Sequence, residues 1–334
     1  MILIIDSVVH MRKTNNLVSA FVALIVLASC SSASDSTSDP TSTNESIIET
    51  TSDSVVAELP VIAVTYSVIG DIVSQLVGDR ANVKVVVPDG QDPHEFQPSA
   101  KDIEIINNAA LVVSNGLEFE EGLEEVLESI TDSGGNNFMV GEHITVRKIE
   151  DGGEHGGEVA DDHGDKHVGG DPHLWLSPAT MLEMLPSLTS ALSEATGADL
   201  SAEATILTTK LQNLDQEVEL IINNLGECNL VSGHDELGYF ADQYGCKVIG
   251  AIIPSFTTTS EATAGELADL KKLIQQYKVP AIFTGLGTSQ DVADQLASEL
   301  GVKAVTLSTH YLDGAANYQE FILKMVNQIA EALG

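Results

Sequence analysis

The stretch DLSAEATILTTKLQNLDQEVELIINNL, residues 199–225, decides the fold that we expect for this chain. It predicts a helix of about 26 residues, which at 1.5 Å per residue would be roughly 39 Å long. Another expected helix comes just before it, with Ser177 as its N-cap and Pro178 as its first residue, and runs to about residue 196. A rigid helix of this length, placed between two regions of alternating strands and helices, would hold two lobes at a nearly fixed separation.

Both flanking regions alternate short apolar strands with amphipathic helices. The strands expected before the long helix are VIAVTY (61–66), VKVVVP (83–88) and ALVVSNG (110–116). The strands expected after it are NLVSG (229–233), KVIGAII (247–253), PAIFTGLG (280–287) and KAVTLS (303–308). This βαβ pattern predicts an α/β fold with two mainly parallel sheets flanked by helices. The expected boundaries are 58–196 for the first lobe, 197–226 for the linker helix and 227–334 for the second lobe.

The N-terminal residues 1–29 have the pattern of an export signal. Arg12 and Lys13 precede the apolar run LVSAFVALIVL, which is too short for a typical membrane span. The LASC sequence that ends at Cys30 resembles the lipobox of bacterial lipoproteins, in which the cysteine is lipidated; an uncleaved anchor is the alternative. Met11 would make a better start than Met1, because MILIIDSVVH carries no basic residue.

Residues 30–57 are rich in serine and threonine, which predicts a disordered tether. The 334 residues carry 50 acidic and 15 basic side chains, and this net charge of −35 argues against nucleic acid as a partner and favours cations, although plain solubility would also explain it. We expect an exported, lipid-anchored monomer. In an oxidising compartment Cys228 and Cys246 are candidates for a disulfide, with free buried thiols as the alternative.

The segment 150–170 is rich in glycine, acids and histidine and lacks any periodicity. It predicts a flexible loop in which His155, His163 and His167 form an auxiliary metal-binding tract, or else a solvated surface loop.

Four other histidines follow expected strands or precede an expected helix: His94, His173, His234 and His310. Ligands of open α/β sheets bind beyond the carboxyl ends of the strands, so the four side chains should meet in the cleft between the lobes. Four imidazoles suit zinc, whereas carboxylate ligands would favour manganese. Asp92 and Asp171, each two residues before a histidine, could accept its second ring N–H. Taken singly, each histidine could instead pack in a core, cap a helix or lie exposed.

Asp235 and Glu236 next to His234 suggest a rival function, a surface zinc hydrolase in which one carboxylate acts as general base. No HExxH motif is present, and a fourth histidine would fill the coordination position that a hydrolase leaves open. A metal-dependent adhesin is a third alternative, for which the sequence offers no specific support. The stretch TGLGTS (284–289) lacks the lysine and spacing of a phosphate-binding loop.

Three motifs resemble the zinc- and manganese-type solute-binding proteins of bacterial ABC importers over about residues 58–334. They are GQDPHEFQP (90–98), DPHLWLSP (171–178) and HDELGYFADQYG (234–245). Ser177 stands where that family usually has aspartate, a change we expect to be neutral because both residues serve as N-caps. The resemblance implies that His94, His173 and His234 bind metal, with Asp92, Asp171 and Asp235 behind them.

The fourth motif, LSTHYLDG (307–314), departs from the family pattern, because His310 stands where Asp or Glu is common. If His310 binds, the site is all-histidine and favours zinc; Asp313 is the fallback ligand. The resemblance implies a receptor, not an enzyme, that captures zinc between two lobes joined by a long helix. It would deliver the ion to a membrane permease driven by a cytoplasmic ATPase. Manganese remains the alternative cargo.

Overall fold

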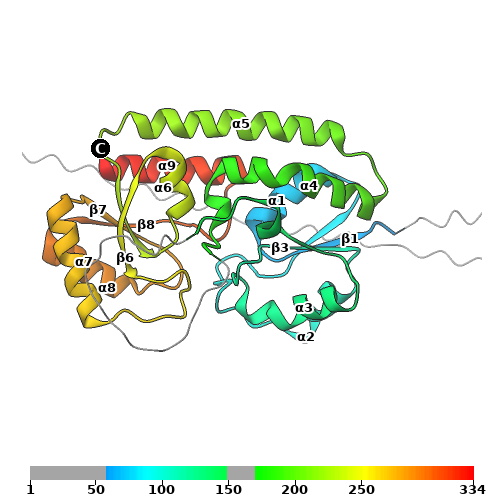
Figure 1. Cartoon of the computed structure of the whole chain (residues 1–334), viewed down its shortest axis with the longest axis horizontal. Helices are drawn as coiled ribbons and strands as arrows, with labels where there is room; N and C mark the ends of the chain where they lie inside the picture. The colour runs from blue at the N-terminus through cyan, green and yellow to red at the C-terminus, as the bar shows by residue number, and fades with distance from the viewer. Residues whose placement is uncertain (1–57, 149–169) are drawn as a thin grey trace, which may run out of the picture. The chain divides into compact units, whose positions relative to one another are not determined.

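The computed structural model describes residues 58–148 and 170–334. The described residues belong to one compact unit. Two four-stranded sheets, each wholly parallel, lie next to each other in this unit, both on the same side of the long helix that joins them (Figure 1). The α/β fold expected from the sequence, with two parallel sheets flanked by helices, is therefore confirmed.

The first lobe contains strands β1 to β4 in the order β2-β1-β3-β4. The strands are β1 (Val61–Val64), β2 (Asn82–Val85), β3 (Leu111–Ser114) and β4 (Asn137–Met139). The helices are α1 (Ser67–Val77), α2 (Ala100–Asn107), α3 (Glu124–Asp132) and α4 (Pro178–Thr196), with short 3₁₀ turns at Glu121–Leu123, Val140–His143 and Leu174–Leu176. Ser99 and Asp102 form the expected capping box at the start of α2.

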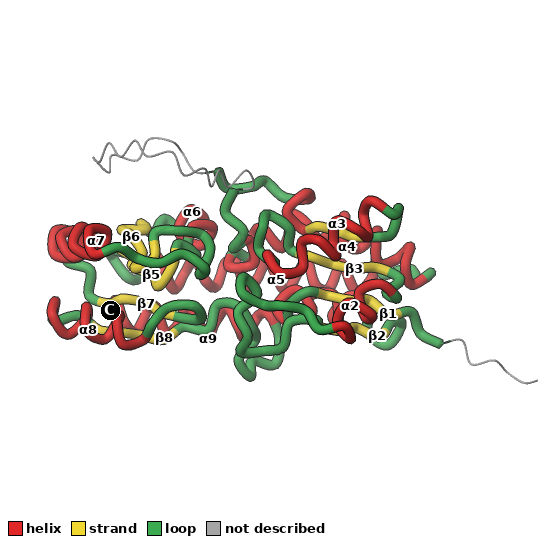
Figure 2. Tube along the Cα trace, turned by 90° about the horizontal axis from the view of Figure 1, so that it is seen from below, coloured by secondary structure: helices red, strands yellow, loops and turns green. Residues whose placement is uncertain are grey.

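The second lobe repeats this arrangement with strand order β6-β5-β7-β8. The strands are β5 (Asn229–His234), β6 (Lys247–Ile253), β7 (Ala281–Thr284) and β8 (Lys303–Thr306). The helices are α6 (Gly238–Tyr244), α7 (Ala264–Tyr277), α8 (Gln290–Leu300) and α9 (Tyr318–Leu333). Figure 2 shows the strands of each sheet side by side and loops occupying the region between the sheets.

Helix α5 (Ser201–Asn223) joins the lobes and is 23 residues long, a little shorter than expected. At its start, Asp199 accepts the backbone N–H of Ser201, an Asx turn that lies before the helix rather than within it. The helix packs on α1 and α4 of the first lobe and on α6 and α9 of the second. Figure 1 shows it running above both sheets.

One hydrophobic core runs through both lobes on the side of α5. Alternation along the strands explains it: Ile62 and Val64 of β1 face this core, whereas Ala63 faces a separate cluster under α2 and α3. In the second lobe Phe283 joins the shared core, and Ile282 faces the cluster under α7 and α8. Because the shared core is continuous, wide separation of the lobes would expose apolar surface. No helix in the described part of the chain is long and apolar enough to cross a membrane.

Candidate metal centre

Four histidine side chains meet between the two lobes. One ring nitrogen from each of His94, His173, His234 and His310 lies within 4.8 Å of the others. All four residues are buried, with exposed fractions of 2, 0, 0 and 1% in that order. The four histidines singled out in the sequence are therefore brought together, and together they could surround one metal ion.

The ends of the parallel strands position these side chains. His234 is the last residue of β5, His94 lies in the loop after β2, and His310 lies in the loop after β8. His173 directly precedes the 3₁₀ turn Leu174–Leu176. In each sheet the strand order reverses next to the first strand, and side chains at such a point converge on a crevice beyond the carboxyl ends.

The rings present unsatisfied nitrogen atoms to one another. The Nε2 atoms of His173 and His234 are 3.0 Å apart. Among the described residues no hydrogen-bond partner reaches either ring nitrogen of His94, Nδ1 of His234 or Nε2 of His310. Buried polar atoms are normally hydrogen-bonded, and leaving several without partners is costly. A cation bound by one ring nitrogen of each histidine would remove part of that cost.

Burial keeps three of these imidazoles in the form that binds metal. It lowers the pKa of His94, His234 and His310 well below the ordinary 6.5, and repulsion between neighbouring histidines lowers each further. The rings are therefore neutral near pH 7, as metal ligation requires.

Aromatic side chains close one side of the cluster. The ring of Trp175 lies 5.5 Å from that of His173 and 5.7 Å from that of His310, measured between centroids. Phe119 lies 4.9 Å from His94 in the same way. The Trp175 indole N–H donates to the carbonyl of Thr309, a hydrogen bond that joins the two lobes next to the cluster.

Asp171 holds His173 as expected. Its Oδ1 accepts the backbone N–H of His173 and lies 3.0 Å from the ring Nδ1, so Nε2 is left to face the cluster. Arg147 contacts the other oxygen of Asp171 at 3.3 Å and donates to Asp242 of α6 at 2.8 Å. Arg147 thereby links the support of His173 to the second lobe.

The expected roles of Asp92 and Asp235 are wrong. Asp92 accepts the backbone N–H of His94 in an Asx turn, and neither ring nitrogen of His94 has a hydrogen-bond partner among the described residues. The carboxylate that faces His234 belongs to Glu236, not to Asp235. Asp235 is half-buried, and desolvation raises its pKa to about 6.

Glu236 faces two of the four histidines. Its Oε1 lies 3.9 Å from Nδ1 of His234, and its Oε2 lies 3.8 Å from Nδ1 of His310. It is 1% exposed, and burial raises its pKa to about 7. Sequence reasoning considered Glu236 only as a catalytic base; the signal that could have revealed its role is its position two residues after a strand-ending histidine.

Asp313, the fallback ligand, lies outside the cluster, and Ser177 caps its helix less fully than expected. The Asp313 carboxylate pairs with Lys324 and is not part of the cluster. The structure therefore places His310, and not Asp313, beside the other three histidines. Ser177 is the N-cap residue of α4, but its side chain makes no capping hydrogen bond. Pro178 at the first helical position already supplies the helix with a favourable backbone angle.

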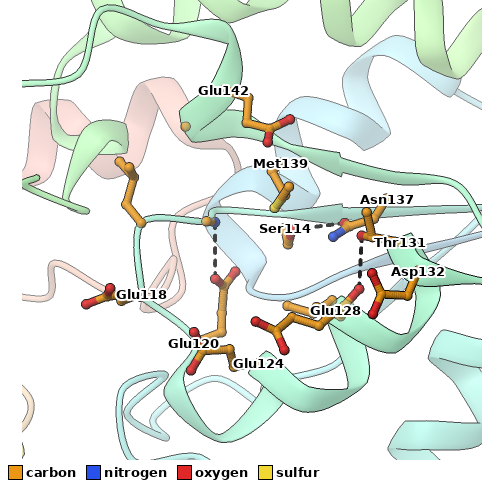
Figure 3. Close-up of a pocket in the computed structure, with 14 residues that line it drawn as sticks. Ser114, Glu118, Glu120, Glu124, Glu128, Thr131, Asp132, Asn137, Met139 and Glu142 are labelled. Carbon is orange, nitrogen blue, oxygen red and sulfur yellow. Dashed lines mark hydrogen bonds between the residues drawn. The ribbon is translucent and has the colours of Figure 1, made fainter. Parts of the chain in front are cut away.

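A cavity of about 460 Å³ reaches the cluster from outside through His94. Glu118, Glu121 and Glu124 line its first-lobe side, and Phe256 and Thr257 line its second-lobe side. A neighbouring cavity of about 650 Å³ shares Glu118 and Glu124 and lies wholly in the first lobe (Figure 3).

Buried Glu120 holds the turn between these cavities. Its carboxylate accepts hydrogen bonds from the Thr65 hydroxyl and from the backbone N–H groups of Asn115 and Gly116, and burial raises its pKa to about 6. Figure 3 shows Glu120 pointing toward this turn. The turn needs such support because Leu117 and Glu118 have φ angles of 59° and 61°, a region that costs energy for residues with a side chain. Nothing in the sequence pattern marked Glu120, Glu121 or Arg147.

The remaining predicted sites divide into two groups. Cys228 and Cys246, which precede β5 and β6, are joined by a disulfide. The lipidation site Cys30 and the loop histidines His155, His163 and His167 lie outside the described residues.

Comparison with known proteins agrees with the geometry. Residues 62–332 match the family profile of ZnuA, described as zinc-uptake complex component A, periplasmic. The zinc-binding protein AdcA of Streptococcus pyogenes is 28% identical over 258 residues, which cover 74% of this chain and 50% of that protein. The zinc-binding lipoprotein AdcA of Streptococcus pneumoniae is 27% identical over 253 residues, 74% of this chain and 49% of that protein. The chain thus spans about half the length of these two relatives.

A solved structure shares the fold. The periplasmic zinc binding protein TroA from Treponema pallidum superimposes with a TM-score of 0.70 at 23% sequence identity, covering 83% of this chain and 100% of that one. At this identity the likeness concerns the fold, and it supports the arrangement of two lobes.

Proposed function

This chain belongs to the family of the periplasmic component A of zinc-uptake complexes, and we propose that it is an extracytoplasmic receptor that captures Zn²⁺ between its lobes. The observation that carries the proposal is the buried cluster of four histidines, three of which have ring nitrogens without partners among the described residues. The ion is cargo rather than a resident cofactor.

We propose His94, His173, His234 and His310 as the four ligands. Zinc accepts four nitrogen ligands in a tetrahedron, and it binds imidazole well, whereas manganese prefers oxygen ligands. The four-nitrogen set therefore supports zinc over manganese. A site whose four positions are filled by protein has no open position for a water nucleophile, which argues against the surface hydrolase. The family, too, is one of receptors and not of enzymes.

The partner and the anchor are also proposals. The description of the family as one component of an uptake complex supports delivery of zinc to an ABC permease with its cytoplasmic ATPase. The lipoprotein among the relatives supports lipidation at Cys30, with residues 30–57 as the tether between the membrane and lobes at 58–196 and 227–334. We propose that the protein acts as a monomer and that the histidines of segment 150–170 bind metal weakly.

The test is an equilibrium titration of the metal-stripped protein with Zn²⁺ against a competing chelator, with Mn²⁺ titrated alongside. We expect one tight zinc site per chain and poor competition by manganese. Equal or tighter binding of manganese would refute the four-histidine site. Absence of any tight site would refute the receptor function.

A further inference from the structure

The four histidines are buried, so the ion needs a route to them. Of the four, His94 alone is among the described residues that line the 460 Å³ cavity. Neither ring nitrogen of His94 has a hydrogen-bond partner among the described residues, although the residue is only 2% exposed. A buried imidazole that lines a cavity and has no partner is suited to receive a cation arriving through that cavity.

The wall of this cavity carries the matching charge. Glu118, Glu121 and Glu124 line it. A cavity lined by one sign of charge attracts ions of the opposite sign and raises their local concentration. The three cluster histidines with a lowered pKa, His94, His234 and His310, are neutral and add no such long-range attraction.

Glu121 connects solvent to the buried histidine. Its side chain is 38% exposed, that of His94 is 1% exposed, and Oε1 of Glu121 lies 3.9 Å from Nδ1 of His94. Two ligands of one tetrahedral zinc ion are roughly 3.4 Å apart, given zinc–ligand distances of about 2.0–2.2 Å. A small movement would therefore let the carboxylate and the ring contact one ion together.

The same carboxylate also closes the cavity. The hydroxyl of Thr257, from the loop after β6, donates to Oε1 of Glu121 at 2.5 Å across the two lobes. An oxygen that binds an incoming ion cannot keep this hydrogen bond unchanged, so ion capture and closure compete for Glu121. The turn held by Glu120 fixes where Glu121 lies.

We propose, on the basis of the receptor function above, that this cavity is the port through which the metal ion reaches the cluster. Glu121 is a transient ligand there, passing the ion to His94 and then closing on Thr257. The port is a site separate from the four nitrogens that hold the ion at equilibrium. Its effect is on the rate of exchange.

The test compares Glu121→Gln with the unaltered protein and with a matched control, Glu125→Gln. Glutamine keeps the shape and an oxygen acceptor for Thr257 but loses the charge and most of the affinity for metal. Glu125 is exposed on α3 and is not among the residues that line either cavity, so its replacement changes only the overall charge. Trp175, the single tryptophan, lies beside two of the histidines and reports binding by its fluorescence.

Stopped-flow mixing of the metal-stripped proteins with Zn²⁺ gives the association rate, and mixing of the loaded proteins with excess chelator gives the dissociation rate. For Glu121→Gln we expect both rates to fall by the same factor, on the order of tenfold, with an unchanged equilibrium Kd. Glu125→Gln should change either rate by less than about twofold, because salt screens a distant charge.

Three results would overturn the port. Association at the unaltered rate would show that Glu121 is not on the route. A weaker Kd caused by faster dissociation alone would make Glu121 a support for bound His94 rather than a transient ligand. If Glu125→Gln slowed zinc association and dissociation as much as Glu121→Gln, the effect would come from the overall charge and not from the port. If the unaltered protein bound no zinc tightly, the receptor function and the port would both fall; if it bound zinc tightly, any of the three results would overturn the port alone.

Discussion

Replacing Glu236 by glutamine should make the metal-free protein more stable and its zinc binding weaker. Glu236 is fully enclosed, and burial raises its pKa from the ordinary 4.5 to about 7. At 1.36 kcal/mol per pKa unit, this rise corresponds to roughly 3 kcal/mol of unfavourable free energy for the ionised carboxylate in the folded state. Glutamine has nearly the same shape and carries no charge, so it avoids this cost.

The sign of the pH dependence follows from the direction of the shift. Because the folded pKa lies above the unfolded one, Glu236 disfavours folding once it ionises. The cost is absent below about pH 4.5, grows as pH rises toward 7, and is complete above that. The stability gain of Glu236→Gln should therefore be largest near pH 8 and vanish near pH 4.

Zinc binding should respond in the opposite direction. Glu236 lies within 3.9 Å of Nδ1 of both His234 and His310, so its negative charge favours a cation bound by these two rings. Loss of a carboxylate in this position typically weakens metal binding 10–100-fold. Because two rings share Glu236, we expect the upper part of that range, about 100-fold.

The assays are urea unfolding of the metal-free protein at several pH values and zinc titration against a chelator. Glu261→Gln, at an exposed position in the second lobe, is the matched control and should change neither quantity. A less stable metal-free Glu236→Gln, or one with unaltered zinc affinity, would refute the reasoning.

The site and the disulfide lead to four further predictions. Chelator-competition titrations should show that His310→Ala weakens zinc binding by more than about 100-fold, whereas Asp313→Asn leaves it unchanged; the reverse order would restore Asp313 as the ligand. Zinc affinity should hold from pH 7.5 to below 6.5 and then fall steeply, because three histidine pKa values are lowered, and a flat profile down to pH 5 would indicate carboxylate ligands. Replacing Cys228 and Cys246 by alanine should lower the free energy of unfolding in urea titrations by about 2–4 kcal/mol. A variant that unfolds at the same urea concentration as the unaltered, oxidised protein would contradict this expectation. Deleting 150–169 should leave one tight zinc site, and its loss would place a ligand in that segment.

The fold could be predicted because its signals are local. Short apolar runs marked the strands β1 and β5, and the capping box at Ser99 and Asp102 marked the start of α2. The four histidines could be grouped because the ends of parallel strands meet at one edge of a sheet, a rule that needs only the order of elements.

The supports of the site could not be predicted, because they depend on side-chain direction. Asp92 and Asp171 occupy equivalent places in two Asp-Pro-His motifs, yet only Asp171 lies beside a histidine ring. Asp235 and Glu236 are neighbours in the sequence, and the turn after β5 directs Glu236 to the histidines. Arg147 reaches Asp171 and Asp242 through contacts that span 24 and 95 residues.

The position of the carboxylates bears on the choice of metal. Asp171 contacts Nδ1 of His173 at 3.0 Å, and Glu236 lies 3.9 Å from Nδ1 of His234 and 3.8 Å from Nδ1 of His310. Both carboxylates thus lie on the Nδ1 side of their histidines, and nitrogen rather than oxygen faces the centre of the cluster. An oxygen ligand would be needed to favour manganese. To supply one, Glu236 would have to move past the rings of His234 and His310 within a buried cluster, displacing packed side chains. The negative charge that offsets the ion thus comes from Asp171 and Glu236, which lie behind the imidazoles. There it strengthens the imidazoles as ligands without replacing them, and this arrangement favours zinc.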